Sequence, residues 1–291
     1  METNAARGVS VQQDQPQFGN AIWQSSDGRS RLYHGDCLEV MASMQPDSVD
    51  CIWTDPPYNL SNDGITCVAG RMVKVNKGEW DRSRGVELDH EFNKAWLAAC
   101  RRVLKPNGTI WVSGTLHVYP SVGFAMQQLG FRILNDIIWE KPAPPPNLGC
   151  RCFTHSTELI LWATKAKKGK DKYTFNYEDM KTENADKQMK NVWRMSAPSK
   201  AEKRHGKHPT QKPVELIARC LRASTNVGDL VLDPFAGAAT TGVAAFALQR
   251  HFVGIEMDKG HAELATRRLA SAVGDYIPRI GAEKRDLLWS E

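Results

Sequence analysis

One strand–loop–helix–strand unit near the C-terminus restricts the fold of this chain more than any other feature. The apolar run at 230–232 predicts a buried strand, and the small-residue loop 233–241 follows it directly. A helix through Leu248 and a second strand at 252–255 come next, and this strand ends in Glu256. Alternating strands and helices are typical of a mostly parallel sheet with helices on both faces. We therefore expect an α/β fold.

The rest of the chain shows the same alternation. Expected strands lie at 31–33, 49–53, 109–113, 131–140 and 158–163, and expected helices at 37–44, 91–104, 119–129, 213–224 and 259–269. We expect a single domain over residues 26–291, preceded by a polar, Gln-rich and disordered tail at 1–25. Residues 59–90 are too long and polar for a plain connection, so we expect a loop insertion there, with a possible strand at 72–75.

A stiff turn follows the expected strand at 49–53, in the sequence Thr-Asp-Pro-Pro-Tyr. Proline lacks a backbone donor, fixes its own φ and keeps the preceding residue out of the helical region. Asp55 and the carbonyl of Pro56 could each accept a hydrogen bond from an amino group, and Tyr58 could stack on a flat ring. The alternative is a proline-terminated strand whose Asp closes a local turn.

The loop at 233–241 has the composition of a nucleoside-binding turn. Its small residues let a ligand approach the backbone, and an acid about 20 positions later can accept ribose hydroxyls. Glu256 lies 19 positions after Gly237. The loop lacks the Gly-x-Gly-x-x-Gly pattern that admits a diphosphate, which argues against NAD or FAD. The alternative is a glycine turn that only packs a helix on the sheet.

The charge of the chain is unevenly distributed. Residues 165–207 contain 13 Lys and Arg against 6 Asp and Glu, a net charge of 13 − 6 = +7, whereas the whole chain has +5, so the remainder sums to 5 − 7 = −2. A basic segment with interleaved aromatics favours a nucleic-acid partner over a solvated surface insertion. No apolar run is long enough for a membrane span. The seven scattered cysteines indicate reduced intracellular thiols, without a metal site or disulfide framework.

Three motifs in a fixed order carry a family resemblance. Asp55-Pro-Pro-Tyr comes first, the hexapeptide His208-Pro-Thr-Gln-Lys-Pro second, and Asp233-Pro-Phe-x-Gly third. In this order the chain resembles the β-class DNA amino-methyltransferases of restriction-modification systems over about residues 30–270. The resemblance implies a Rossmann-like, S-adenosylmethionine-dependent fold that is circularly permuted, with the catalytic half before the cofactor half. It also implies a target-recognition region, which we place at about 165–207.

The resemblance assigns a role to each matching residue. Asp55 and the carbonyl of Pro56 would bind the target amino group, Pro57 would shape the turn, and Tyr58 would stack on a flipped base. Asp36, which taken alone is better explained as a helix cap, would contact the adenine of the cofactor. The implied residues of the cofactor site are Asp36, Cys37, Thr210, Lys212, Asp233, Phe235, Ala236, Gly237, Ala239, Thr240, Glu256 and Met257.

The implied activity is methylation of adenine N6 in DNA, because Asp as the first residue of the tetrapeptide resembles the adenine enzymes. Open alternatives are methylation of cytosine N4, an RNA or protein methyltransferase, and an inactive DNA-binding module. The expected partner is double-stranded or also single-stranded DNA. We expect a monomer or homodimer, without membrane contact, in the cytoplasm of a bacterial or phage-infected cell.

Overall fold

The computed structural model describes residues 21–58, 65–68, 71–74, 82–166 and 172–276. Within this part, one nine-stranded sheet has the order β1-β2-β11-β10-β3-β6-β8-β7-β9, and β4 and β5 form a separate hairpin. The strands are β1 (Trp23–Gln24), β2 (Arg31–His34), β3 (Val49–Thr54), β4 (Ile65–Val68), β5 (Arg71–Lys74), β6 (Leu104–Gly114), β7 (Arg132–Glu140), β8 (Thr157–Thr164), β9 (Val192–Arg194), β10 (Leu230–Asp233) and β11 (His251–Glu256). The helices are α1 (Cys37–Ser43), α2 (Val86–Val103), α3 (Tyr119–Gln128), α4 (Tyr177–Glu183), the short 3-10 helix η2 (Ala201–Lys203), α5 (Val214–Ser224), α6 (Thr240–Ala247) and α7 (Lys259–Tyr276).

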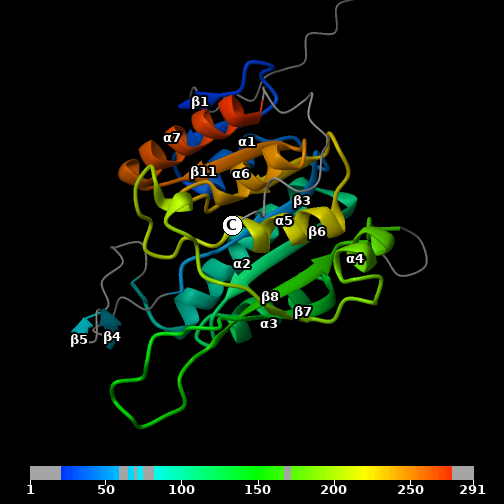
Figure 1. The fold of residues 1–291 in the computed structure, drawn as a ribbon. Helices are drawn as coiled ribbons and strands as arrows, with labels where there is room; N and C mark the ends of the chain where they lie inside the picture. Colours follow the sequence, from blue (N-terminus) through cyan, green and yellow to red (C-terminus); the bar gives the residue numbers. More distant parts are fainter. Residues whose placement is uncertain (1–20, 59–64, 69–70, 75–81, 167–171, 277–291) are drawn as a thin grey trace, which may run out of the picture.

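The centre of the large sheet is parallel. Strands β2, β11, β10, β3 and β6 run in one direction, whereas β8 is antiparallel to both β6 and β7. Figure 1 shows the orange C-terminal strand β11 in the same sheet as the blue β3. The sheet continues outward from β10 through β11 and from β3 through β6, so the chain order reverses between β10 and β3. Open α/β sheets bind ligands outside the carboxyl ends of the strands at such a point.

Helices cover both faces of the sheet (Figure 1). On one face, α5, α6 and α7 enclose a core that includes Leu221, Phe252 and Leu269. On the other face, α1, α2 and α3 enclose a second core around Trp96 and Met126. Full burial of such a side chain stabilises the fold by roughly 1.5–3 kcal/mol. The expected α/β fold and its mostly parallel sheet are therefore confirmed.

A carboxylate ties the two halves of the chain together at the amino ends of the central strands. Asp50 in β3 accepts a hydrogen bond from the backbone N–H of Leu230, the first residue of β10, at 2.9 Å. Its other oxygen lies 2.6 Å from the Nζ of Lys105 in β6. The hydrogen bond fixes β3 against β10, and the ion pair fixes it against β6, at the end of the sheet opposite to the Asp-Pro-Pro-Tyr turn.

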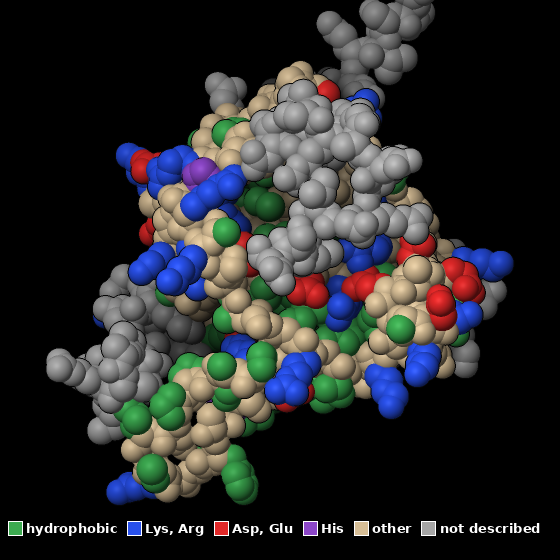
Figure 2. Space-filling model, viewed as in Figure 1, with side chains coloured by type: hydrophobic (Ala, Val, Ile, Leu, Met, Phe, Trp, Pro, Cys, Tyr) green, Lys and Arg blue, Asp and Glu red, His purple; other side chains and the backbone are tan. Residues whose placement is uncertain are grey.

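Two segments project from the body of the molecule in Figure 1. One is the hairpin of β4 and β5. The other is the loop 142–156 between β7 and β8, drawn in green, whose base is closed by a hydrogen bond of 2.7 Å from Lys141 N to the carbonyl of Ser156. Phe153 on this loop is 96% exposed. Figure 2 shows hydrophobic side chains over the same projection.

The bounds expected for the tail and for the insertion differ from those of the structure. The tail expected at 1–25 ends earlier, because Trp23 and Gln24 pair with β2, and Trp23 packs on Phe246 with ring centroids 5.8 Å apart. Residues 1–20 lie outside the described part. Helix α2 starts at Val86, inside the insertion expected at 59–90, because Gly85 with φ 103° allows the turn into it. Much of that insertion also lies outside the described residues.

The region expected to recognise the target, 165–207, contains α4, β9 and η2 in its described part. Trp193 does not offer its ring to solvent, because it is 6% exposed and its indole N–H donates to the carbonyl of Lys190 at 2.8 Å. Tyr173 is also used internally, edge-on against Trp162. Trp193 and Tyr173 therefore contribute to packing, whereas the other two aromatics, Phe175 and Tyr177, are 46% and 39% exposed.

None of the helices in the described part of the chain is long and apolar enough to cross a membrane.

Candidate active site

The site lies where β3 and β10 end side by side. Asp233 is the last residue of β10, and Asp55 follows the last residue of β3. The two strands are parallel neighbours, with Leu232 opposite Ile52. Parallel strands have their carboxyl ends at the same edge of a sheet. The fold therefore brings together two motifs that come from opposite halves of the chain.

The loop between β10 and α6 is organised by its first residue. The Oδ1 atom of Asp233 accepts from the backbone N–H of Phe235 at 3.1 Å, and Oδ2 accepts from the hydroxyl of Thr241 at 2.6 Å. Gly237 has φ 52° and Ala239 has φ 53°, both in the left-handed region. Two left-handed residues turn the chain sharply from the strand into the helix and keep the loop backbone close to the sheet edge.

Glu256, at the end of β11, faces this loop. Its Oε2 accepts from the backbone N–H of Gly237 at 2.7 Å, and its Oε1 accepts from the backbone N–H of Asp258 at 2.8 Å. Burial raises the pKa of Glu256 above its ordinary value, although these hydrogen bonds act against the rise. A carboxylate oxygen can accept more than one hydrogen bond. Glu256 is therefore held in place and still able to accept hydroxyl groups of a ligand.

A hydrogen bond between its last and first residues closes the Asp-Pro-Pro-Tyr turn. The hydroxyl of Tyr58 donates to Oδ1 of Asp55 and lies 3.2 Å from the hydroxyl of Ser113 in β6. Tyr58 is only 6% exposed, and burial raises its pKa well above the ordinary value, so it remains a neutral donor. Pro56 is buried, whereas Asp55 and Pro57 are half-buried at the wall of the cavity.

Lys212 reaches the same turn from the opposite side. Its ammonium group forms an ion pair with Oδ2 of Asp55 and lies 3.4 Å from Oε2 of Glu158 in β8. It also donates to the carbonyl of Thr210 at 3.3 Å. Burial alone would lower the pKa of Lys212, but Asp55 and Glu158 more than offset this and raise it. The sequence placed Lys212 in the cofactor site; the structure places it in contact with Asp55.

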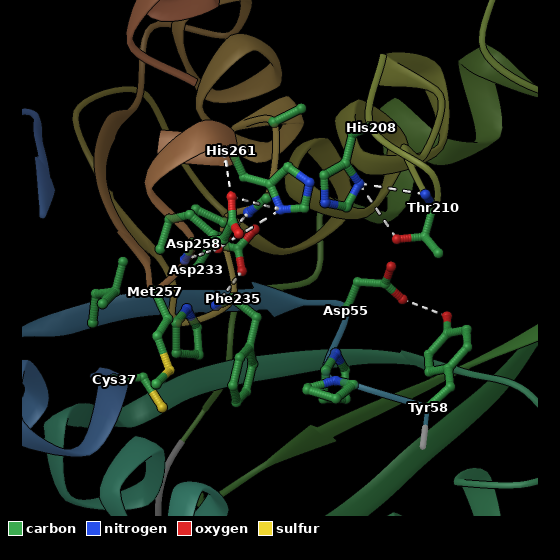
Figure 3. Close-up of a pocket in the computed structure, with 18 of the residues that line it drawn as sticks. Cys37, Asp55, Tyr58, His208, Thr210, Asp233, Phe235, Met257, Asp258 and His261 are labelled. Carbon is green, nitrogen blue, oxygen red and sulfur yellow. Dashed lines mark hydrogen bonds and ion pairs between the residues drawn. The ribbon is translucent and has the colours of Figure 1, made fainter. Parts of the chain in front are cut away.

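These groups line one cavity of about 1160 Å³. Figure 3 shows Cys37 and Met257 at one end, Asp55 and Tyr58 at the other, and Phe235 between them. All four residues of the turn line the cavity, and so do all the predicted cofactor residues except one. The exception is Ala239, which is 0% exposed and packs in the core, so that only its backbone shapes the loop.

Asp36 fits both explanations that the sequence offered. Its Oδ1 caps helix α1 by accepting from the backbone N–H groups of Leu38 and Glu39, at 2.7 and 3.2 Å. It also lines the cavity together with Cys37. Burial raises the pKa of the Cys37 thiol to about 12, so the thiol is neutral. The capped helix thus presents one acid and one uncharged side chain to the ligand space.

The sequence analysis missed several residues of the cavity wall. They are Gly35, Leu38, Trp53, Arg82, Ser83, Arg84, Asp89, Phe92, His208, Ile217, Ala238, Thr241, Ile255, Asp258 and His261. His208 stood in a motif that was noticed, yet its role depends on a distant partner. Its ring lies 4.2 Å from that of His261 in α7, measured between centroids. Only the fold brings the two histidines together.

His208 and Asp233 have strongly shifted pKa values. Burial, with contributions from His261 and Lys212, lowers the pKa of His208 to about 3. Burial also raises the pKa of Asp233 to about 7, although its hydrogen bond from Thr241 acts in the other direction. His208 is therefore neutral at physiological pH. Perturbed groups gathered in one cavity are typical of functional sites.

Among the described residues, no group of three or more His, Cys, Asp or Glu side chains is placed to hold a metal ion. The carboxylate of Asp55 and the carbonyl of Pro56, in a turn made rigid by its prolines, instead give two acceptors that can hold an amino group by its hydrogens. The adjoining cavity offers a carboxylate and a small-residue loop, which suits a nucleoside.

Comparison with known proteins agrees with this geometry. The family model described as DNA methylase, of the N6/N4 type, matches residues 49–267. The chain belongs to this DNA methylase family. The match spans the turn, the basic region and the cofactor-type loop, so it includes all three motifs that the sequence analysis singled out.

Curated relatives cover most of the methylase. It is 52% identical over 238 residues to the Type II methyltransferase M2.DpnII of Streptococcus pneumoniae, which is 82% of this chain and 88% of that protein. It is 47% identical over 246 residues to the Type II methyltransferase M2.MboI of Moraxella bovis, or 84% and 89% of the two chains. The resemblance to enzymes of restriction-modification type is therefore confirmed.

The fold is also found among solved structures. A structure of the M1.HpyAVI–SAM complex superposes with a TM-score of 0.60 at 28% identity, covering 82% of the methylase and 98% of that chain. The Rossmann-like architecture expected from the sequence is thus confirmed. The methylase acts on DNA, which confirms the expected class of substrate.

Proposed function

We propose that the protein transfers a methyl group from S-adenosylmethionine to the exocyclic N6 of adenine in DNA. The observation that carries this proposal is the single cavity shared by the Asp-Pro-Pro-Tyr turn and the loop of Asp233. A reaction between a nucleoside-bearing donor and an aromatic amine needs both in one place. Holding the reactants in the correct geometry supplies a large part of such a rate enhancement.

The residues of the cavity fit S-adenosylmethionine. Its length from Cys37 to Asp55 suits an extended molecule, and its volume of about 1160 Å³ exceeds the roughly 300–1,000 Å³ of most small-molecule sites. A Cβ atom on Gly237 would lie 3.1 Å from Nε2 of His208, so the glycine keeps this part of the wall open. Asp55 and Asp233 give the other end acidic groups, which favour a sulfonium cation.

We assign the cofactor contacts from these positions. Glu256 accepts the ribose hydroxyls, and Asp36 contacts the amino group of the cofactor adenine, next to the neutral surfaces of Cys37 and Met257. The loop from Asp233 through Thr240 lines the methionine part, with Thr210 beside it. When bound, S-adenosylmethionine supplies an electrophilic methyl group on sulfur.

The turn positions the nucleophile. Asp55 and the carbonyl of Pro56 each accept one N–H of the target amine, while Tyr58 and Pro57 form the wall against which the base rests. These hydrogen bonds favour a more tetrahedral nitrogen, whose lone pair is less conjugated with the ring. A nitrogen–carbon bond forms as the carbon–sulfur bond breaks with its electrons going to sulfur, and one amine proton is released toward Asp55. The target base must leave the stack first.

The choice of adenine rests on the turn itself. Its first residue is Asp, as in the adenine enzymes that the motif resembles, whereas Ser is commoner in the cytosine enzymes. The carboxylate oxygens of Asp55, one of them in an ion pair with Lys212, act as acceptors. Methylation of cytosine N4 uses the same geometry and is distinguished by the product.

DNA contact is proposed for the region 165–207 and for the insertion at 59–90. In the first of these, exposed cationic side chains lie along the described segment; they are Lys172, Lys187, Lys190, Arg194, Lys200, Arg204 and Lys207. Figure 2 shows Lys and Arg side chains spread over the same face of the molecule. Such residues bind phosphates and position the protein on DNA.

We further propose that the enzyme works as a monomer or homodimer in the cytoplasm. Its substrate includes double-stranded DNA and also single-stranded DNA, in which the target base needs no extraction from a paired stack. Gel filtration with light scattering gives the oligomeric state.

The test is transfer of labelled methyl groups from S-adenosylmethionine to unmethylated genomic DNA, followed by nucleoside analysis of the digest. The proposal predicts the label in N6-methyladenine. Label in N4-methylcytosine would keep the mechanism and correct the base. No label in double- or single-stranded DNA, from a folded protein that binds the cofactor, would refute the proposed substrate.

A further inference from the structure

A buried chain of four charged residues stands behind the turn. Asp55 pairs with Lys212, Lys212 lies 3.4 Å from Glu158, and Glu158 pairs with Lys141. Two carboxylates and two ammonium groups alternate along this chain, so its formal charge sums to zero. The side chain of Lys212 is 5% exposed and that of Glu158 is 13% exposed. Charges this deep are retained only when they are paired.

Glu158 itself stands outside the ligand cavity, although it touches two groups of the site. It lies in β8, away from the cavity lining, and its Oε2 is 3.5 Å from the hydroxyl of Tyr58. Burial alone would raise the pKa of Glu158, but Lys212 and Lys141 more than offset this and lower it. Glu158 is thus a carboxylate that can influence a bound base only through Lys212 and Tyr58.

Lys141 closes the chain at the surface. Its side chain, 24% exposed, pairs with Glu158 and lies over the ring of Trp139, with Nζ 4.8 Å from the ring centroid. Its backbone N–H closes the base of the projecting loop through the carbonyl of Ser156 at 2.7 Å. Lys141 is therefore held by three separate contacts, and it in turn limits where Glu158 can point.

We propose that Glu158 and Lys141 are positioning residues for methyl transfer, which hold Lys212 beside Asp55 so that this carboxylate stays correctly aimed. The proposal rests on the role of Asp55 in the proposed function.

The geometry explains why positioning is needed. Asp55 must keep lone pairs directed at the target amine, and its two oxygens are already engaged, Oδ1 by Tyr58 and Oδ2 by Lys212. Those two partners fix the plane of the carboxylate. The ammonium group of Lys212 also donates to the carbonyl of Thr210 at 3.3 Å, which competes with Asp55 for its direction. Glu158 restricts it from the far side, and Lys141 restricts Glu158.

Charge balance leads to the same conclusion. Without Glu158, Lys212 would have Asp55 as its sole carboxylate partner in this cluster and would be free to shift across its oxygens, masking the lone pairs that the amine needs. Without Lys141, Glu158 would turn its full charge to Lys212 and draw it away from Asp55. Either change alters the orientation of Asp55 while leaving Glu256 and the cofactor loop untouched.

The experiment compares variants of the Glu158–Lys141 ion pair with variants of the Asp50–Lys105 ion pair, which serves as a matched control. Glu158→Gln and Lys141→Met test the cluster. Asp50→Asn and Lys105→Met are the controls, because Asp50 also binds a lysine and one further donor, at the opposite ends of the strands. Single-turnover methyl transfer with saturating DNA, cofactor Kd and Tm are measured for each variant.

We expect the transfer rate of Glu158→Gln and Lys141→Met to fall by about ten- to a hundredfold, the usual effect of removing a supporting partner. Cofactor Kd should stay within about twofold of wild type, equivalent to about 0.4 kcal/mol. Lys141→Arg keeps the charge and should restore most of the rate. The control pair should change Tm without changing the transfer rate.

A double-variant cycle separates positioning through Lys212 from a general structural effect. Once Lys212→Met has removed the link, adding Glu158→Gln should lower the rate no further, so that the two effects are not additive. Lys141→Met is close to the surface and provides the test if Lys212→Met does not fold.

The result for wild-type protein keeps the two proposals distinguishable. If wild type transfers methyl groups to DNA while Glu158→Gln and Lys141→Met transfer at the wild-type rate, the positioning role is refuted and the proposed function stands. The positioning role is also refuted if the transfer rates of these variants fall only in proportion to their losses of stability and of cofactor affinity. Absence of transfer by wild type would instead overturn the proposed function.

Discussion

At the scale of single residues, the site depends on a backbone that few side chains allow. Gly237 combines φ 52° with a close approach to His208 and a hydrogen bond to Glu256. Ala239 also adopts a left-handed conformation, which costs a non-glycine residue roughly 1–2 kcal/mol. Its methyl group is buried in the core, so packing compensates for that strain. Gly237 would gain no such compensation from a side chain, since a Cβ atom there would meet the ring of His208.

Replacement of Gly237 by alanine should therefore weaken cofactor binding. The new Cβ atom would lie 3.1 Å from His208 and push either the ring or the loop out of place. We expect at least about a tenfold rise in cofactor Kd, equivalent to about 1.4 kcal/mol. Isothermal titration with S-adenosylmethionine measures this.

Gly228→Ala is the matched control for that variant. Gly228 has φ 84°, but nothing lies within 4 Å of the position of a new Cβ. The control should lose a similar amount of stability from backbone strain and keep its cofactor Kd. Equal Kd values for the two variants would show that the approach of His208 to Gly237 is unimportant.

At the scale of elements, the sequence predicted those segments whose own pattern is strong. The strands at 230–232 and 252–255 and the helix at 213–224 were found because continuous apolar runs and a helical stripe mark them locally. Each appears in the structure within two residues of its expected ends. The turn after β3 was also predictable, because its prolines determine the backbone without any help from the tertiary structure.

Elements that depend on distant partners were missed. Strand β9 has only three residues and exists because it pairs with β7, opposite Trp139. Helix α4 is short and is held by Glu183, which pairs with Arg219 and Arg222 of α5. Neither segment carries a repeating apolar pattern long enough to be recognised. Short elements are stabilised mainly by packing and tertiary contacts.

The same distinction applies to the site. Asp55, Gly237 and Glu256 belong to motifs and could be placed from the sequence. Lys141 and Glu158 could not, because they are ordinary charged residues whose partners are determined by the pairing of β7 and β8. Lys212 lies between these cases: its motif was recognised, but its contact with Asp55 depends on the fold.

At the scale of the whole molecule, the cavity links stability to pH. The pKa of His208 is lowered from 6.5 to about 3, so the unfolded chain binds a proton at this site before the folded protein does. The stabilisation is complete above pH 6.5 and is lost as the pH falls toward 3. Asp233 acts in the opposite sense: its pKa is raised from 3.8 to about 7, so its burial costs most above pH 7.

His208→Asn should therefore lose less stability on acidification than wild type. The two pKa values of His208 predict a difference of about 2 kcal/mol in the free energy of unfolding between pH 7 and pH 5, since one pKa unit corresponds to about 1.4 kcal/mol. Urea denaturation at the two pH values measures it. His34→Asn, at an exposed position of β2, serves as the control. Parallel losses in wild type and His208→Asn would contradict the burial of a neutral His208.

In this mechanism the Asp-Pro-Pro-Tyr turn performs the transfer, while the other half of the cavity binds the cofactor. Asp55 follows the end of β3 and Glu256 ends β11, and β10 lies between these two strands. Removal of Asp55 also leaves Lys212 a second carboxylate partner in Glu158, which protects the fold. The two functions should therefore separate in one variant.

Asp55→Ala provides the most direct measurement of this claim, with transfer of labelled methyl groups to DNA and cofactor Kd measured on the same preparation. We predict that transfer falls by about 10²–10³-fold or more, the effect of removing one preorganised group, while the cofactor Kd stays near that of wild type. A folded Asp55→Ala protein that keeps wild-type transfer, or that loses transfer and cofactor binding in parallel, would contradict the account.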